Sequence, residues 1–295
     1  MEHDNGGGPI GAAVAAPWEL THVLRRECPW DQVQTAATIV PHTLEEAWET
    51  ADAARSAQRA VDEGSLGPER DAALADFEDE LGDLIFQVCF LAMWCGEQTD
   101  GSIDLGTVAT RIFDKLVRRH PHVFGDSAMP DDANAVLTQW DQVKRDQEQR
   151  GPFEGIPDAM PAVARARKVQ SRAANMGFEY GDVRAALADL EDEVRELREA
   201  IDAADAAGTL PDGAQAPPDA HTEAELGDVI YAAVNVARFL RVDPELATAD
   251  ATRTFQSRVE RAMAIAAAEG TDFATSELTA QEALYQRAKR ELRGH

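Results

Sequence analysis

The chain has 295 residues, of which 44% are hydrophobic, and its 28 basic and 54 acidic residues give a net charge of −26. This length favours two domains of about 150 residues, each with enough apolar side chains for a core. The charge argues against a nucleic-acid partner bound through a broad basic surface. An anionic small molecule can still bind where a metal ion and a local basic cluster offset the repulsion.

The sequence shows no pattern typical of a membrane-spanning or secreted protein. No run of 18 uncharged apolar residues occurs, so we expect no transmembrane helix and no membrane partner. The acidic, glycine-rich start lacks the basic residues of a signal peptide. The three cysteines, Cys28, Cys89 and Cys95, form no disulfide or metal framework. These features predict a cytoplasmic protein.

The first part of the chain combines a flexible start with a short helix. Residues 1–16 are rich in Gly and Ala and are predicted to be disordered. A helix is expected over 18–26. It carries Glu19 and His22, the only Glu-x-x-His pair in the chain, whereas a di-iron bundle site would need two.

The segment Cys28-Pro29-Trp30-Asp31-Gln32-Val33-Gln34-Thr35 follows. Pro29 and the Asp and Thr residues are typical of a loop that enters a helix. In the simplest interpretation this is a structural turn with a buried Trp30.

Two long helices are predicted next, over 43–60 and 70–98. Thr43 can cap the first, with Glu46 at the capping-box position. The second contains Glu80-Leu81-Gly82-Asp83 followed by apolar residues at helical spacing. Gly82 allows either the close approach of a backbone or ligand, or tight helix packing.

A helix over 103–119 ends in a basic cluster that contains Lys115, Arg118 and Arg119. Such a cluster suits the phosphates of an anionic ligand, although cations at a helix end also favour its negative dipole. A further helix over 132–149 carries Trp140 and Lys144. Trp140 could stack on a base or lie in a core, and Lys144 could contact phosphate.

The second half is predicted to be helical as well, over 183–205, 222–240, 244–268 and 277–292. No alternating strand pattern and no glycine-rich phosphate loop occurs. We therefore predict an all-α protein with two tandem helical-bundle domains. The expected boundaries are 17–149 and 163–295, joined by a Gly- and Pro-rich linker over 150–162.

The two halves repeat one pattern. Glu80-Leu81-Gly82-Asp83 returns 145 positions later as Glu225-Leu226-Gly227-Asp228. A single acidic pair at this spacing arises by chance about ten times in so acidic a chain, usually on a solvated helix face. Several landmarks that recur in the same order indicate a tandem duplication instead. The other matched landmarks are Glu46 with Glu193, Arg119 with Arg258, Trp140 with Tyr285, and Lys144 with Lys289.

The repeated carboxylates suit a metal ion. Residues i and i+3 share a helix face, so two antiparallel helices could converge four carboxylates on one point. Like charges held so close need a counter-ion, and oxygen ligands select a hard cation such as Mg²⁺ or Mn²⁺. The two predicted metal sets are Glu46, Glu49, Glu80 and Asp83, and Glu193, Glu196, Glu225 and Asp228.

These motifs together resemble the bacterial MazG nucleoside triphosphate pyrophosphohydrolases over residues 17–292. The resemblance implies an all-α, usually dimeric enzyme that converts nucleoside triphosphates to the monophosphate and pyrophosphate with Mg²⁺. It also implies a role in clearing abnormal nucleotides or altering nucleotide pools. The segments that carry it are Cys28–Asp31 with Gln34-Thr35, Leu44–Glu49, Glu80–Asp83, Arg118–Phe124 and Ala174–Phe178.

Further roles follow from the resemblance. It assigns phosphate contacts to Lys115 and Arg119. The chemistry of the site asks for cations that screen the developing charge, which Lys115 and Arg119 would supply, and for a base that accepts the water's proton, such as Glu45 or Glu49. Other substrate contacts fall on Arg118, Trp140, Lys144, Arg253, Arg258, Tyr285 and Lys289.

One position departs from the family pattern. Thr254, with Arg253 beside it, stands where the second half should repeat Lys115. The second half is catalytic in some relatives, but this departure leads us to expect that the first half carries a substantial share of turnover. Two alternatives stay open. One is a pyrophosphohydrolase specific for dUTP or phosphoribosyl-ATP, and the other is a non-enzymatic nucleotide sensor or interaction protein.

Overall fold

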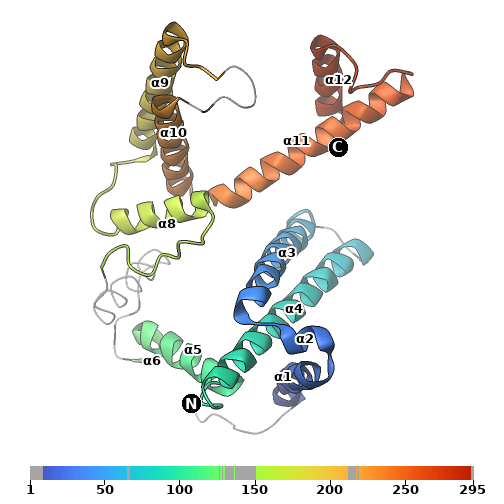
Figure 1. Ribbon diagram of the computed structural model, residues 1–295, viewed down its shortest axis with the longest axis vertical. Helices are drawn as coiled ribbons and strands as arrows, with labels where there is room; N and C mark the ends of the chain where they lie inside the picture. The colour runs from blue at the N-terminus through green and yellow to red at the C-terminus, as the bar shows by residue number, and fades with distance from the viewer. Residues whose placement is uncertain are drawn as a thin grey trace. The chain divides into compact units, whose positions relative to one another are not determined.

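The computed structural model describes residues 9–64, 67–125, 151–211 and 219–293, together with 127, 129, 136 and 217. Within these residues the chain forms helices and no strand, which confirms the predicted all-α class (Figure 1). None of the described helices is long and apolar enough to cross a membrane. The helices are α1 (Pro9–Glu27), α2 (Pro29–Val33), α3 (Ala36–Asp62), α4 (Pro68–Gln98), α5 (Leu105–Arg119), α6 (Pro121–Phe124), α8 (Ala162–Ala174), α9 (Val183–Ala207), α10 (Ala220–Phe239), α11 (Pro244–Ala268) and α12 (Leu278–Glu291).

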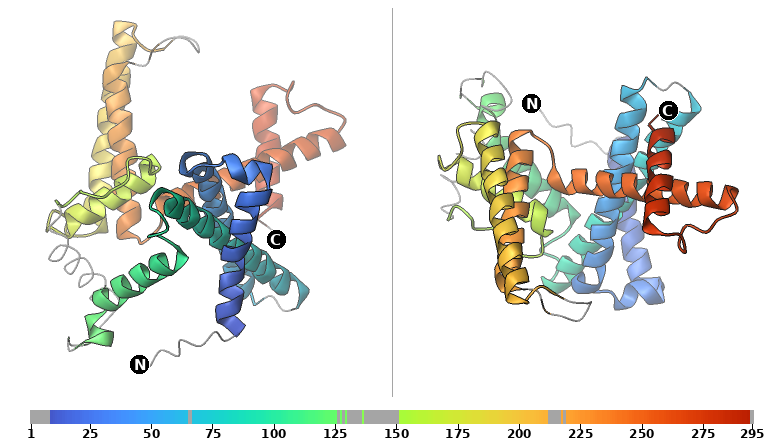
Figure 2. Two further views of the ribbon diagram at one scale, coloured as in Figure 1. Left: turned by 60° about the horizontal axis from the view of Figure 1, so that its bottom comes forward. Right: turned by 90° about the horizontal axis from the view of Figure 1, so that it is seen from above.

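The chain divides into two compact units, Met1–Asp131 and Asp132–His295. Each contains a pair of long helices packed along their lengths, α3 with α4 and α9 with α10. The two helices of each pair stay side by side when the molecule is turned (Figure 2). The tandem arrangement agrees with the sequence repeat.

Polar contacts fix the register of α3 on α4. Thr43 donates its hydroxyl hydrogen to Oε1 of Gln87 at 3.1 Å, and Thr50 donates to the backbone carbonyl of Glu80 at 3.3 Å. These bonds hold the acidic segment of α4 against α3. The core of this unit consists of Ile39, Phe90 and Met93, with Trp18, Phe86 and Leu91 packed against it.

Arg25 ties the Cys28–Thr35 segment to α4. Its guanidinium makes two charge-assisted hydrogen bonds to Glu97, of 2.8 and 2.7 Å, and also donates to the carbonyls of Asp31 and Gln34. The segment contains the short helix α2, and Trp30 is half exposed, so the prediction of a turn with a buried Trp was wrong.

Small side chains line the contact between α9 and α10. Alanines let two helices approach closely, because little side-chain volume separates the backbones. The buried residues of this pair are Ala186, Ala200, Ala204, Ala232 and Val234. A separate core joins α11 to α12 and consists of Ala262, Ile265, Ala266, Leu284 and Ala288.

Several predicted boundaries need correction. Residues 9–16 are helical rather than disordered, as their alanines favour. The helix predicted to begin at Thr43 begins at Ala36, where Thr35 and Thr38 form a reciprocal cap. Pro41 lies within this helix. Helix α8 was not predicted, because its N-cap, Pro161, makes no side-chain bond and so provides no capping signal. The helix predicted over 132–149 lies outside the described residues except for 136.

Candidate functional site

The first acidic set lies on the α3–α4 pair. One carboxylate oxygen from each of Glu46, Glu49 and Glu80 lies within 4.8 Å of the others. Glu46 and Glu49 share a face of α3, and Glu80 comes from α4. Asp83 is close enough for its charge to act on both Glu46 and Glu80. The structure therefore clusters three carboxylates of this set, and Asp83 is near enough to act on two of them.

The electrostatics of this set favour a bound cation. Desolvation raises the pKa of Glu46, and the charges of Asp83, Glu49 and Glu80 raise it further. Desolvation also raises the pKa of Glu80, with contributions from Glu49 and Asp83. Oε2 of Glu80 is buried and has no hydrogen-bond partner in the described part of the chain. A divalent ion would satisfy this oxygen and neutralise the mutual repulsion, so the residues present fit such an ion.

The second acidic set repeats this arrangement on α9 and α10. Oxygens of Glu193, Glu196 and Glu225 lie within 4.8 Å of one another. The pKa of Glu193 is raised first by desolvation and then by the charges of Asp228 and Glu196. Two carboxylates of this set also have local partners. Glu196 pairs with Arg195 at 3.3 Å, and Glu225 lies 3.4 Å from the ring of His221.

Gly82 and Gly227 occupy equivalent places beside the two sets. A Cβ added at either position would meet nothing within 4 Å in the described part of the chain. Tight packing within this chain therefore does not explain these glycines. The other interpretation, close approach by a ligand or another backbone, remains.

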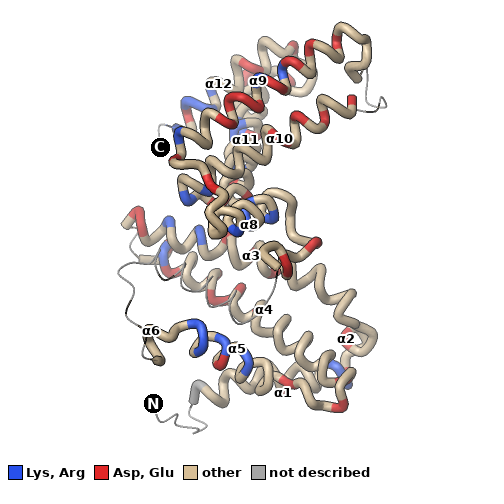
Figure 3. Tube along the Cα trace, turned by 90° about the vertical axis from the view of Figure 1, so that its left-hand side faces the viewer, with Lys and Arg blue, Asp and Glu red and all other residues tan. Residues whose placement is uncertain are grey.

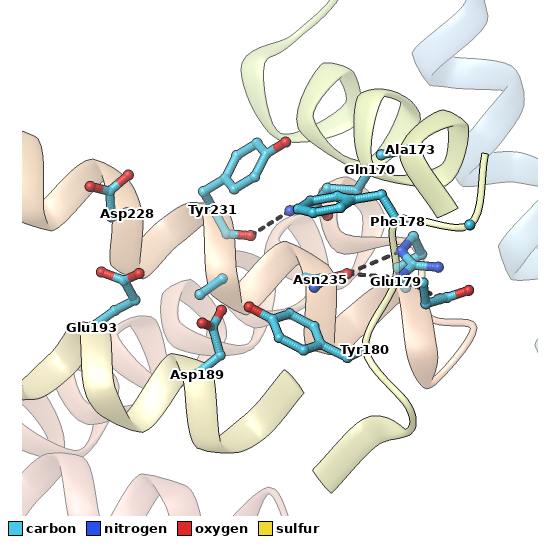
Figure 4. Close-up of a pocket in the computed structure, with 13 residues that line it drawn as sticks. Gln170, Ala173, Phe178, Glu179, Tyr180, Asp189, Glu193, Asp228, Tyr231 and Asn235 are labelled. Carbon is cyan, nitrogen blue, oxygen red and sulfur yellow. Dashed lines mark hydrogen bonds and ion pairs between the residues drawn. The ribbon is translucent and has the colours of Figure 1, made fainter. Parts of the chain in front are cut away.

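A cavity of about 390 Å³ adjoins the second set (Figure 4). Glu193 and Asp228 line one side of it, and Tyr180 and Asp189 also contribute to its wall. Tyr180 donates its hydroxyl hydrogen to Asp189, and this bond, aided by burial, raises the pKa of Tyr180 to about 12.

Most of this cavity was not predicted from the sequence. Its signals were the two metal candidates Glu193 and Asp228 and the segment up to Phe178, which supported the family resemblance. The wall residues that these signals did not identify include Gln170, Tyr180, Asp189, Tyr231 and Asn235.

The basic candidates of the first half lie on α5, which packs against α4 and α6. Figure 3 shows basic positions along this helix. Lys115 and Arg118 line a shallow groove together with Arg111, and Arg119 follows at the end of the helix. Trp140 and Lys144 lie outside the described residues.

The substrate candidates of the second half lie on the α11–α12 pair. Arg253 pairs with Asp250 at 2.6 Å, and the ring of Tyr285 lies 5.8 Å from that of Phe255. Arg258 is on α11 and Lys289 on α12. The structure thus places these side chains on one helix pair and the second acidic set on another.

Glu45, one of the two candidate bases, is separate from the first acidic set. Its carboxylate is exposed and lies 3.2 Å from Nδ1 of His42. Glu49, the other candidate, belongs to the three clustered carboxylates.

Residues 34–124 match the MazG nucleotide pyrophosphohydrolase domain. Over 272 residues the chain is 35% identical to the nucleoside triphosphate pyrophosphohydrolase of Escherichia coli K12, which covers 90% of this chain and 91% of that protein. The chain belongs to the MazG family. A second MazG relative, the nucleoside triphosphate pyrophosphohydrolase/pyrophosphatase MazG of Thermotoga maritima, is 30% identical over 237 residues, or 79% of this chain and 78% of that protein. The resemblance predicted from the motifs is thereby confirmed.

The similarity to MazG proteins extends beyond the matched domain. The domain match contains the first acidic set, whereas the alignment with the Escherichia coli protein is long enough to include both halves. The nucleoside triphosphate pyrophosphohydrolase of Mycobacterium tuberculosis matches a shorter part, with 32% identity over 157 residues.

Proposed function

We propose that this chain hydrolyses nucleoside triphosphates between the α- and β-phosphates and releases the monophosphate and pyrophosphate, with Mg²⁺ or Mn²⁺ as the metal. The observation that carries the proposal is the pair of carboxylate clusters, in each of which three oxygens from two helices lie within 4.8 Å. Membership of the MazG family and the names of the relatives support it.

Each acidic set would hold divalent metal. When bound, such ions neutralise phosphate charge and lower the pKa of a bound water. The buried, unpartnered Oε2 of Glu80 supports this role for the first set. The proposed ligands are Glu46, Glu49, Glu80 and Asp83 in the first half, and Glu193, Glu196, Glu225 and Asp228 in the second.

The side chains around the metal ligands would move the proton and stabilise charge. We assign the general base to Glu49, because it belongs to the carboxylate cluster, whereas the carboxylate of Glu45 lies beside His42. Lys115 and Arg119 would donate hydrogen bonds to phosphate oxygens as negative charge develops. The further substrate contacts proposed are Arg118, Trp140, Lys144, Arg253, Arg258, Tyr285 and Lys289.

We also propose that the enzyme works as a cytoplasmic homodimer of two-domain chains, with domains at 17–149 and 163–295, and that it clears nucleotides from the pool. Support for the dimer comes from α5, which buries none of its residues, all of them described. Ile112 and Leu116 are exposed on this helix, and a second copy would cover such a face.

The decisive experiment measures pyrophosphate and nucleoside monophosphate from a panel of ribo- and deoxyribonucleoside triphosphates with Mg²⁺ or Mn²⁺. We expect release of both products, and loss of release when Glu80→Gln and Glu225→Gln are combined. Glu78→Gln is the matched control, because Glu78 is exposed and lies two residues before Glu80, on the opposite side of α4. Nucleotide binding without pyrophosphate under either ion would refute the enzyme and favour a sensor. Activity confined to dUTP or phosphoribosyl-ATP would replace the general activity by a specific one.

A further inference from the structure

Gln170 has a buried acceptor without a donor. The residue is 7% exposed, and its Nε2 donates to the backbone carbonyl of Tyr231 at 2.8 Å. A carbonyl oxygen can only accept, so the nitrogen of the amide must face Tyr231 and Oε1 must point elsewhere. No hydrogen-bond partner for Oε1 exists among the described residues. Buried acceptors are normally satisfied, so this oxygen points to a ligand that brings an N–H or O–H.

Gln170 lines the cavity that Glu193 and Asp228 also line. A volume of about 390 Å³ is within the range of small-molecule sites. Phe178 contributes an aromatic ring that is 84% exposed, and Tyr231 contributes another. In Figure 4 the acidic pair lies on one side, and Gln170 and Phe178 lie on the other. Aromatic rings at a cavity offer stacking surface for a planar base.

Asn235 has a fixed orientation in the same wall. Its Oδ1 accepts hydrogen bonds from Nε and Nη2 of Arg238 at 3.1 and 2.9 Å. Arg238 is held in turn by Glu179 at 2.7 Å. These bonds leave Nδ2 of Asn235 as the donor side of its amide. The cavity therefore carries an acceptor from Gln170 and a donor from Asn235, the two kinds of group that a nucleobase edge needs.

We propose that this cavity holds the nucleoside part of the substrate, with Oε1 of Gln170 accepting an N–H of the base and the phosphates directed toward Glu193 and Asp228. The inference rests on the proposed function, because the ligand is taken to be its substrate. Each of the four common bases carries at least one N–H donor, so the contact admits all of them. It disfavours polyphosphates without a base and bases without a donor.

The test measures binding in this cavity alone. A fluorine label, 4-fluorophenylalanine at position 178 of the full chain, is followed by ¹⁹F NMR with Mg²⁺ present. The probes are α,β-methylene ATP, the same analogue of purine riboside triphosphate, and inorganic tripolyphosphate. Purine riboside lacks the exocyclic amine, which is the only N–H donor of adenine. We expect the ATP analogue to bind about tenfold more tightly than the purine riboside analogue.

Replacement of the acceptor should abolish this preference. In Gln170→Met the two nucleotide analogues should bind with equal affinity, and tripolyphosphate should bind as it does to the parent chain. Gln87→Met is the matched control. It removes a glutamine that is 6% exposed but whose Oε1 already accepts from Thr43, and it should keep the tenfold preference.

Three results would overturn the inference: equal affinities of the two nucleotide analogues in the parent chain, an unchanged preference in Gln170→Met, or an unmoved label. The first comparison needs no mutation at Gln170 and therefore decides even where Gln170→Met does not fold. Pyrophosphate release from ATP, measured in parallel, separates this inference from the proposed function. Release with an unmoved label refutes the cavity alone, whereas base-dependent binding without release refutes the enzyme alone.

Discussion

Glu80→Gln should stabilise the metal-free protein and destabilise the metal-bound one relative to the parent chain. In the parent, Oε2 of Glu80 is buried and has no donor among the described residues, and Glu49 and Asp83 place further negative charge near it. Glutamine keeps the size of the side chain and removes the charge. The variant therefore loses repulsion in the absence of metal but also loses a ligand for it.

The pH dependence of this difference has a definite sign. The folded state raises the pKa of Glu80 from its ordinary value of 4.5, so the folded protein keeps a proton that the unfolded chain has lost. The free energy of unfolding of the parent therefore falls as pH rises from 4.5 through the raised pKa, and it falls no further above that value. The advantage of Glu80→Gln in EDTA should grow over this window and then stay constant.

Added Mg²⁺ should make the parent chain more stable than Glu80→Gln. At a concentration of 100 times its Kd, an ion that binds only the folded state adds about 2.7 kcal/mol to the free energy of unfolding. For a unit of this size, each kcal/mol raises Tm by about 2–4 °C, so the parent should gain roughly 5–11 °C. Glu80→Gln should gain much less, because one of its clustered carboxylates is gone.

Tryptophan fluorescence is the suitable assay, because four of the five tryptophans lie in the Met1–Asp131 unit. Thermal melts in EDTA and in Mg²⁺ would be compared for the parent, Glu80→Gln and the control Glu78→Gln. If Glu80→Gln melts below the parent in EDTA at neutral pH, the unpartnered carboxylate is not a source of strain and the argument fails. Equal gains from Mg²⁺ in both proteins would remove Glu80 from the metal site.

Three further predictions concern other residues. Gly82→Ala should raise the free energy of unfolding by about 0.5–1 kcal/mol in urea melts, since an added Cβ meets nothing within 4 Å in the described chain. A lower free energy of unfolding would show that another group already lies against Gly82. Arg25→Met should cost about 2–3 kcal/mol in the same melts, because it leaves Glu97 and two backbone carbonyls without their donor; a change below about 0.5 kcal/mol, the scale of a neutral surface substitution, would contradict a stabilising role of Arg25. Separate kcat measurements should show a substantial loss for Glu80→Gln, and a parent-like rate there with an inactive Glu225→Gln would instead assign turnover to the second half.

The all-α class and the two acidic sets were accessible from the sequence because both depend on spacing along a helix. Glu46 and Glu49 had to share a face once α3 was helical, and the repeated Glu-Leu-Gly-Asp segment identified its partner helix. The start of α3 was less accessible. Thr43 has a good capping sequence, but the reciprocal bonds of Thr35 and Thr38 begin the helix earlier.

The cavity could not be predicted because it depends on tertiary contacts between distant segments. Gln170 contacts α10 by donating a hydrogen bond to the backbone carbonyl of Tyr231. Every residue has such a carbonyl, so the pattern of side chains does not predict this contact. Tyr180 and Asp189 come from a loop and a helix whose approach no periodicity encodes. Burial of the Gln170 amide becomes visible only when α8 is placed on α10.

Helix α5 links the activity of the enzyme to its concentration if a second copy covers this helix. A helix of 15 residues is marginal in water by itself, and α5, although it contacts α4 and α6, has no fully buried residue. A partner that covered the exposed Ile112 and Leu116 would add to its stability. Lys115 and Arg119 are on the same helix, so their alignment on a phosphate would depend on that cover. If the cover is a second copy, activity per molecule should fall at low enzyme concentration, and KM would be the more sensitive constant.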